Sequence, residues 1–457
     1  MSGQAADATS RVGGAADLIR NDLAELLRLA WPVVFARVGI MTMGLTDALV
    51  VGQYSAVQLG YHALGWAPTA VVLTVGLGLI SGVQVMASRA LGEGRLHEAG
   101  AVLRRGLSYS LWIGLASTAI LVAGGPLFLR HAGLAPDLAQ GASRALVVFS
   151  MSLPATALSV AGSSWLEGLG RPKPAMAMMW IANVVNLLAD LLLVPGTFGL
   201  PAMGAVGGAW ATTASRTALA VVTLIYIARM KDASALGVFD KPVRDHPREI
   251  AQRRIGYGAG ASNLFEVAAF ASMNVIAGWL GAIAVAAYAA VINVASLVFM
   301  VPLGLSTATA VLVGRAYGAG DRAGVTRAAL VGFSVAAVFG IAVSLLVWPG
   351  AELIARAFTR DPAAMALAAT ALALSALFLA PDAVQVVVAQ ALRTRGDVLA
   401  PTLTHMTSYA VVMIPLAAYL AVPAGMGIPG ILWAIILATF LSAALLLGRF
   451  WFLSRRR

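Results

Sequence analysis

The most regular feature of the sequence is a series of apolar runs, each about 20 residues long and separated by short polar segments. A helix needs about 20 apolar residues to cross a bilayer, so these runs predict membrane-spanning helices and not the shorter alternating strands of a barrel. We predict about twelve spans, which are 25–50, 66–88, 104–127, 144–168, 174–195, 204–228, 256–279, 285–312, 324–348, 365–391, 400–421 and 428–452.

Polar residues interrupt the fifth of these runs. Residues 180–194 read WIANVVNLLADLLLV and carry Asn183, Asn186 and Asp190. Asn186 and Asp190 are four residues apart, so on a helix they share one face. A carboxylate in a membrane helix is costly and usually faces a bundle interior or a wet cavity. Carboxylate and amide oxygens predict a site for a hard cation or a proton, and the alternative is hydrogen bonding between helices.

The first span carries a second acid, Asp47. Asp47 lies near the end of its span that has few basic residues, so its side chain could also extend to the membrane surface. If Asp47 and Asp190 faced one cavity, they would disfavour double ionisation unless a cation or a shared proton were present. That competition is a mechanism for exchanging one positive charge for another.

The second half of the chain has its own intramembrane acids. Glu266 lies mid-span with Asn263 nearby, and Asp382 follows Pro381 inside an apolar run. A proline there can kink the helix and free a backbone carbonyl. Gln385 is three residues after Asp382 and can share its face. These residues predict a second polar site, with bonding between helices as the alternative for Gln385.

Two arginines also fall inside predicted spans. Arg37 and Arg216 would be costly there unless they were paired. Arg216 is four residues after Thr212 and on the same helix face. We expect one or both arginines to neutralise a cavity acid or to form a gate, unless they extend to the surface instead.

The composition supports a membrane protein and excludes several chemistries. Hydrophobic residues make up 60% of the chain and charged residues 11%, with a mean hydropathy of +0.86. The chain has no cysteine, its five histidines show no zinc-site spacing, and no ATP-binding Walker motif occurs. The net charge of +11 resides in short loops between apolar runs, which is a signal of topology and not of nucleic-acid binding.

The basic residues fall in alternate loops, so the positive-inside rule places both termini in the cytosol. The polar, Ala/Gly-rich start resembles a disordered tail and not a signal peptide. The high Ala, Gly and Arg content is typical of a GC-rich bacterium, which predicts the bacterial inner membrane. We predict a disordered tail over 1–23, a six-helix lobe over 24–229, a cytosolic loop over 230–254, a second six-helix lobe over 255–453 and a basic cytosolic tail over 454–457.

The two halves of the chain echo one another 226 residues apart. The matching pairs are Gly52 and Gly278, Gly78 and Gly304, Arg89 and Arg315, Gly92 and Gly318, Gly94 and Gly320, Leu166 and Leu392, and Gly170 and Gly396. Six spans in the same orientation per half predict two lobes about an axis along the membrane normal, with a central cleft.

At this level of detail the sequence resembles the MATE (multidrug and toxic compound extrusion) family of secondary transporters. The likeness covers about residues 26–449 and rests on Pro32, the pair at 46–47 (TD), and the segments 88–95 (SRALGEGR), 167–176 (EGLGRPKPAM), 186–190, 204–212 (GAVGGAWAT), 265–267 (FEV), 314–321 (GRAYGAGD) and 381–397 (PDAVQVVVAQALRTRGD).

The resemblance implies an all-α, twelve-helix antiporter that exports amphipathic organic cations in exchange for Na⁺ or H⁺. It implies a cation or proton site at Asp47, Asn186, Asp190 and Thr212, and a cation or substrate site at Glu266 and Asp382. We expect no cofactor besides the coupling ion, no partners other than the lipid bilayer and small organic cations, and a monomer.

Three other functions are weaker readings of the same residues. A lipid-linked oligosaccharide flippase of the same superfamily would need a more basic cavity for its pyrophosphate. A membrane-embedded enzyme would need paired metal-binding acids or histidines near a membrane face, and the sequence has none. A channel is disfavoured by the two-lobe repeat and the lack of a repeated filter motif.

Overall fold

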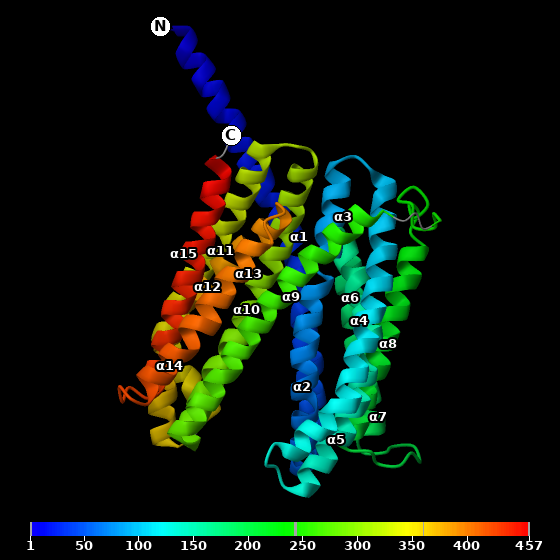
Figure 1. The fold of residues 1–457 in the computed structure, drawn as a ribbon, viewed down its shortest axis with the longest axis vertical. Helices are drawn as coiled ribbons and strands as arrows, with labels where there is room; N and C mark the ends of the chain where they lie inside the picture. The colour runs from blue at the N-terminus through cyan, green and yellow to red at the C-terminus, as the bar shows by residue number, and fades with distance from the viewer. Residues whose placement is uncertain (1, 242–244, 360, 456–457) are drawn as a thin grey trace. The chain divides into compact units, whose positions relative to one another are not determined.

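The computed structural model describes residues 2–241, 245–359 and 361–455. For residues 2–13 and 15 it describes the backbone alone. All regular structure in these residues is helical (Figure 1). The elements are α1 (Ser2–Tyr54), α2 (Ala56–Ile80), α3 (Gly82–Gly92), α4 (Leu96–His131), α5 (Pro136–Met151), α6 (Leu153–Gly168), α7 (Pro172–Leu193), α8 (Ala205–Ala228), α9 (His246–Leu280), α10 (Ala282–Gly318), α11 (Arg322–Phe358), α12 (Pro362–Thr394), α13 (Leu399–His405), the π-helix η1 (Met406–Met413), α14 (Ile414–Ala421) and α15 (Ile428–Arg455).

Within the described residues, 11 helices are long and apolar enough to cross a membrane, or 12 when the bent pair α5 and α6 counts as one span. This confirms the all-α membrane fold. The break falls inside the predicted span 144–168, because Pro154 has no N–H to give to the carbonyl of Ser150. The Thr118 hydroxyl donates to that carbonyl instead, at 2.7 Å.

Contacts divide the chain into two compact units. Unit 1 comprises Met1–Val34 and Phe265–Arg457, and unit 2 comprises Phe35–Leu264. Helices α1 and α9 therefore each begin in one unit and end in the other. These divisions lie inside helices and differ from the lobe limits drawn from the sequence at 229 and 255, which remain a prediction.

The chain start is helical where we expected a disordered tail over 1–23, since α1 begins at Ser2. Alanine has the highest helix propensity, and residues 2–24 are rich in it. At the other end, α15 continues to Arg455, and residues 456–457 of the predicted basic tail lie outside the described residues.

The predicted loop 230–254 is shorter than expected and packs on unit 2. Helix α9 already begins at His246. Ahead of it, the Leu236 carbonyl accepts a hydrogen bond of 2.8 Å from the Gly100 amide. The Arg171 guanidinium donates to both oxygens of Asp232, at 2.9 and 2.6 Å. Since these bonds join residues far apart in sequence, the described residues 230–241 of the predicted loop form an ordered segment, which we call the strap.

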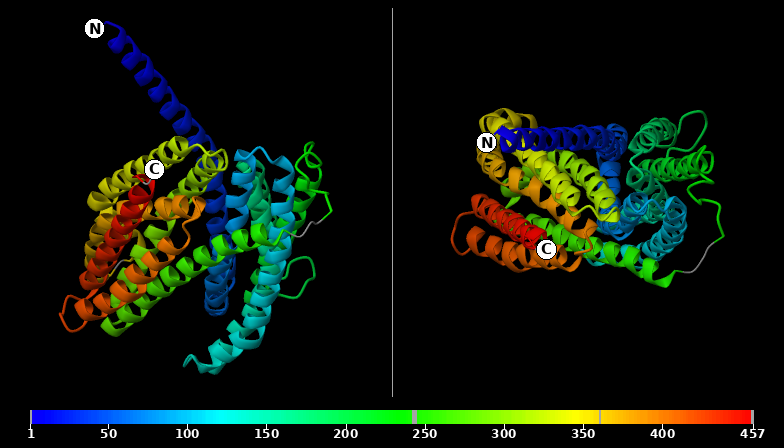
Figure 2. Two further views of the ribbon diagram at one scale, coloured as in Figure 1. Left: turned by 45° about the horizontal axis from the view of Figure 1, so that its top comes forward. Right: turned by 90° about the horizontal axis from the view of Figure 1, so that it is seen from above.

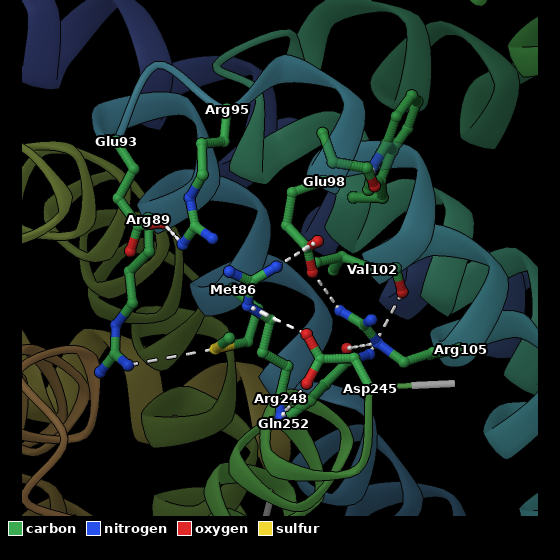
Figure 3. A network of polar contacts seen from close by, with 12 residues as sticks. Met86, Arg89, Glu93, Arg95, Glu98, Val102, Arg105, Asp245, Arg248 and Gln252 are labelled. Atoms are coloured by element: carbon green, nitrogen blue, oxygen red, sulfur yellow. Dashed lines mark hydrogen bonds and ion pairs between the residues drawn. The ribbon is translucent and has the colours of Figure 1, made fainter. Parts of the chain in front are cut away.

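A polar network fastens the start of α9 to α4 (Figure 3). Glu98 on α4 accepts from Arg105 at 2.6 Å and from Arg248 on α9 at 2.7 Å. Gln252 on α9 donates to the Val102 carbonyl at 3.2 Å. Glu98 and Arg105 are largely buried, so this network is screened less by salt than an exposed ion pair.

The part of α1 that belongs to unit 1 is fastened in the same way but with the charges exchanged. Asp22 on α1 pairs with Arg327 on α11 at 2.6 Å, and Glu25 pairs with Arg315 on α10 at 2.7 Å. Asp22 and Arg248 are 226 residues apart, so they occupy equivalent places in the repeat. Each half therefore anchors its first helix at an equivalent position with an ion pair of opposite polarity.

Equivalent glycines bring these helices together. A Cβ on Gly78 would lie 2.7 Å from the Gly260 backbone, and a Cβ on Gly304 would lie 2.4 Å from the Val34 side chain. The pairs Gly78/Gly304 and Val34/Gly260 are each 226 residues apart. Because lipid provides no hydrophobic drive between helices, such close backbone approach is a main source of packing energy. In both units a glycine at an equivalent repeat position allows a neighbouring helix to pack closely: α9 packs on Gly78, and α1 packs on Gly304.

The repeat extends to the backbone of the turns. Gly94 and Gly320 both have positive φ, +70° and +73°, which glycine adopts at little cost. The following amides of Arg95 and Asp321 donate to carbonyls five residues back, at 3.0 and 2.9 Å. The two halves therefore share helix endings as well as helix order, and Figure 2 shows the helices from two further sides.

We expect Gly78→Val to lower the free energy of unfolding by about 1–3 kcal/mol, because the new side chain meets the α9 backbone. Gly76→Val is the matched control, since a Cβ on Gly76 meets nothing within 4 Å. Thermal unfolding in detergent measures both. Equal melting temperatures for the two variants would contradict this packing.

The strap should loosen in acid. Its two hydrogen bonds from Arg171 lower the pKa of the Asp232 carboxyl below its ordinary value. The pair therefore stabilises the docked strap above the pH at which a free Asp titrates, about 3.9, and the stabilisation is lost as pH falls through the lower pKa of the docked state.

We expect pepsin at about pH 4.5 to cut the strap faster in Arg171→Gln than in wild type, with the difference vanishing well below the titration of a free Asp. Lys231→Gln removes an exposed charge beside Asp232 and is the control. Equal cleavage of Arg171→Gln and Lys231→Gln at the higher pH would exclude this role.

Candidate functional site

Unit 2 contains a buried polar cluster built on four helices. None of its six residues is more than 7% exposed. They are Asp47 on α1, His62 on α2, Asn186 and Asp190 on α7, and Thr212 and Arg216 on α8. The structure thus brings Asp47, Asp190 and Thr212 together, adds His62 and Arg216, and buries Asn186 one turn before Asp190 on the same helix.

The sequence of α7 explains how Asn186 and Asp190 come to be buried. The helix begins at Pro172, whose fixed φ and missing N–H suit a first turn. The apolar side chains of α7 point outward, and they are those of Ile181, Val184, Leu187, Leu188 and Leu191. In a lipid environment this face is the one that needs no partner, so the polar face turns into the protein.

Asp47 is held by its neighbours and does not extend to the surface. The Thr212 hydroxyl donates to Asp47 Oδ2 at 2.5 Å, and His62 Nε2 lies 3.9 Å from the same oxygen. Asp47 is only 3% exposed, which overturns the alternative that its carboxylate extends to the membrane surface. A hydrogen bond to a charged oxygen is stronger than one between neutral groups.

Other polar atoms of the cluster are available to a ligand. Asp47 Oδ1 and both Asp190 oxygens are buried without an N–H donor among the described residues, and the oxygen and nitrogen of the Asn186 side chain are buried there without a hydrogen-bond partner. Asp190 and Asp47 interact electrostatically. Buried polar groups in proteins nearly always have partners, so these oxygens are suited to holding a cation or a proton.

Arg216 is buried at 7% exposure, which excludes the alternative that it reaches the surface. Its guanidinium lies 4.9 Å from the Trp66 ring centroid and donates to the Ser152 hydroxyl at 3.4 Å. It also attracts Asp47 electrostatically. Arg216 thus offsets part of the charge of Asp47, while its hydrogen bond goes to Ser152.

Arg37 has a different partner, the buried Glu167 on α6, with a nitrogen–oxygen distance of 3.5 Å. Two further residues expected near a cavity are bonded to helix backbones instead. Asn183 donates to the Met179 carbonyl of its own helix at 2.9 Å, and Asn263 donates to the Thr74 carbonyl of α2 at 3.0 Å. The Asn183 bond stays within α7, so it differs from the hydrogen bond between helices expected as the alternative for this residue.

Unit 1 contains the second polar cluster. Gln385 donates to Asp382 Oδ1 at 3.3 Å and accepts from the Ser442 hydroxyl on α15 at 3.3 Å. Glu266 on α9 interacts electrostatically with Asp382 and with the buried Arg393. Glu266 and Asp382 are half-buried, whereas Gln385 is fully buried. The structure thus brings together the two expected acids and Gln385.

A π-helix lies beside this cluster. His405 caps η1 and Tyr409 lies within it, and their ring centroids are 5.6 Å apart. Both His405 nitrogens are buried without a hydrogen-bond partner among the described residues, and the buried Tyr409 hydroxyl interacts with the Gln385 side chain. Short π-helical segments are frequent at functional sites because the extra residue re-aims side chains. Both rings interact with charged groups of the cluster, Arg393 for His405 and the two acids for Tyr409.

Sequence reasoning missed several of these polar residues as site members, namely His62, Glu167, Arg393, His405, Tyr409 and Ser442. His62 and His405 could have been found as ionisable residues inside apolar runs. Glu167 and Arg393 lie within the segments that carry the family resemblance, close to glycines that match between the two halves. Nothing in the sequence marks η1 as a π-helix.

No group of three or more His, Cys, Asp or Glu residues in the described ranges could hold a metal ion. A site for Na⁺ would instead combine two carboxylates with amide and hydroxyl oxygens, which both clusters contain.

A family model described as MatE matches residues 32–192 and 259–419, two stretches of equal length in corresponding parts of the repeat. The chain belongs to the MATE family. This confirms the resemblance seen in the sequence, and with it a multi-pass membrane transporter that is not an enzyme.

The relatives agree with that assignment. A probable multidrug resistance protein NorM of Caulobacter vibrioides is 61% identical over 432 residues, covering 94% of this chain and 92% of that protein. The multidrug resistance protein NorM of Vibrio cholerae is 28% identical over 400 residues, covering 87% of each.

Solved MATE structures share the fold at low sequence identity. The eukaryotic MATE transporter AtDTX14 is 17% identical with a TM-score of 0.86, covering 95% of this chain and 96% of that one. An outward-facing multidrug resistance MATE transporter of the MOP superfamily is 20% identical with a TM-score of 0.85, covering 95% and 97%.

We expect Thr212→Val to destabilise the protein by about 1.5–3 kcal/mol, because Asp47 loses a buried hydrogen bond to a charged oxygen. Thr212→Ser keeps the hydroxyl and should unfold near the wild-type temperature. Thr217→Val, one turn further on α8 and exposed, controls for valine in this helix. The hydrogen bond has no such role if Thr212→Val and Thr217→Val melt together.

Proposed function

We propose that this MATE protein is a cation-coupled antiporter that exports amphipathic organic cations across the bacterial inner membrane. The observation that carries the proposal is the buried pair Asp47 and Asp190, of which Asp47 Oδ1 and both Asp190 oxygens have no N–H donor among the described residues. A carboxyl pair inside a membrane helix bundle is stable only with a compensating positive charge, which is what an exchanger moves. The multidrug resistance names of the relatives at 61% and 28% identity support the substrate class.

The residues available in each cluster define the roles we propose for them. In unit 2, Asp47, Asp190, Asn186 and Thr212 would hold the coupling ion, Na⁺ or H⁺, because all four supply oxygen ligands. In unit 1, Glu266 and Asp382 would hold a coupling ion or the organic cation.

Exchange would follow from competition for these acids. An ion entering from outside lowers the affinity of the acids for a positively charged drug, and alternating access separates loading from release. We further propose both termini in the cytosol, a monomer, no bound cofactor besides the coupling ion, and no partners other than lipid and small organic cations. A flippase for lipid-linked oligosaccharides is not favoured, because each cluster has more acids than arginines and a pyrophosphate needs the reverse.

The test is ethidium efflux from proteoliposomes under an imposed Na⁺ or H⁺ gradient. We expect one of the gradients to drive efflux in wild type, and Asp190→Asn to reduce it at least tenfold, since an amide cannot bind and release a proton and binds a cation weakly. Glu266→Gln should also reduce it. Glu352→Gln alters an exposed acid and should leave it unchanged.

If neither gradient moves ethidium in correctly inserted wild-type protein, drug export is excluded. If efflux is normal in Asp190→Asn, the acid pair is not the exchange site.

A further inference from the structure

The two clusters have the same ionisable composition although their residues differ. Each contains two carboxyls, one buried arginine and one buried histidine. In unit 2 these are Asp47, Asp190, Arg216 and His62, and in unit 1 they are Glu266, Asp382, Arg393 and His405. When both acids of a cluster are ionised and its histidine is neutral, the two carboxylates and one guanidinium leave one negative charge, which a bound cation compensates.

This likeness was not inherited through the repeat. The position equivalent to Arg216 in the second half is Ser442, and the position equivalent to Arg393 in the first half is Glu167. The two arginines therefore reach their clusters from different helices, α8 and α12. A shared charge balance made from unrelated positions points to a requirement on charge and not on packing.

In unit 2 the arginine interacts electrostatically with Asp47. Arg216 is one turn beyond Thr212, the donor to Asp47, and its guanidinium lies over Trp66. A chain of ring contacts then leads back to the acid: Trp66 to Phe149 at 5.3 Å, Phe149 to His62 at 5.0 Å, and His62 to Asp47 at 3.9 Å. The guanidinium thus contributes charge while the oxygens of Asp190 remain open to a ligand.

In unit 1 the arginine is also held by a neutral side chain. Arg393 Nη1 donates to Gln390 on the preceding turn at 3.5 Å, and the arginine attracts Glu266 electrostatically. Asp382 receives a hydrogen bond from Gln385. In both units, then, one carboxylate accepts a hydrogen bond from a neutral donor, Thr212 or Gln385, while the arginine interacts with one acid of the cluster electrostatically.

We propose that Arg216 and Arg393 set the charge of the ligand, so that each cluster accepts a single positive charge and discriminates against two. The ligand class is a monovalent cation, either an inorganic ion or an organic monocation. The inference rests on the proposed exporter function, and it identifies the arginines as specificity-determining residues that act through charge.

Ethidium and propidium test this discrimination because they share one fluorophore but carry one and two positive charges. Both are titrated onto purified full-length protein in detergent, followed by fluorescence. We expect Arg393→Gln or Arg216→Gln to improve propidium affinity relative to ethidium by about tenfold, on the order of one additional Coulomb interaction in a partly screened site. Arg→Lys at the same position keeps the charge and should keep the wild-type ratio.

Competition with Ca²⁺ and Na⁺ for bound ethidium distinguishes the source of the ligand. Arg216→Gln should make Ca²⁺ the stronger competitor if unit 2 takes the inorganic ion. A change in the propidium ratio confined to Arg393→Gln would place the organic cation in unit 1. If instead Arg393→Gln makes Ca²⁺ the stronger competitor and only Arg216→Gln changes the propidium ratio, the inorganic ion binds in unit 1 and the organic cation in unit 2. That result would still support the role of the arginines.

Second-site neutralisation separates charge from structure. Arg216→Gln with Asp47→Asn, and Arg393→Gln with Asp382→Asn, restore one net negative charge and should return the propidium ratio toward wild type. Arg356→Gln removes an exposed charge and controls for net charge. Unchanged ratios in both single glutamine variants, or double variants that fail to reverse them, would overturn the proposal. Failure of wild type to bind or export ethidium would instead overturn the proposed function.

Discussion

A charge inside a membrane must be compensated by another group of the protein or by a ligand, and this constraint accounts for where the polar residues of this chain lie. Arg37 is compensated by Glu167, and the pair is complete. Asp47 interacts with one arginine, Arg216, and with a second acid, Asp190, so the compensation of this acid pair is incomplete. The first arrangement is structural, whereas the second provides a place for a mobile positive charge.

The same constraint operates with opposite polarity at the starts of α1 and α9. Each helix starts in one unit and ends in the other. Asp22 on α1 and Arg248 on α9 occupy equivalent repeat positions, and each fastens its helix within the unit where that helix starts, through ion pairs with Arg327 and Glu98. The equivalent glycines Gly78 and Gly304 allow α9 and α1, respectively, to pack closely against them. The duplication therefore preserved the geometry of the anchors while the signs of their charges were exchanged.

Much of the fold could be predicted because membrane helices are long apolar runs, and the repeat could be read from glycines that positive φ or close packing requires. The acids of both clusters stood out because a carboxylate in lipid is rare. The pairing of Arg37 with Glu167 could not be predicted, since the two residues are 130 apart and only packing joins them. The π-helix around Tyr409 and the helical start of the chain depend on tertiary contacts and propensity that the apolar pattern does not record.

The most direct test of the account is infrared difference spectroscopy of the purified protein with and without tetraphenylphosphonium, in Na⁺-containing and Na⁺-free buffer. The account predicts that binding changes carboxyl bands. A protonated carboxyl band is lost if protons are exchanged, and carboxylate bands shift if Na⁺ is exchanged. The changes should shrink in Asp190→Asn and in Glu266→Gln. Tetraphenylphosphonium binding without any carboxyl change would contradict the claim that these buried acids exchange the charge.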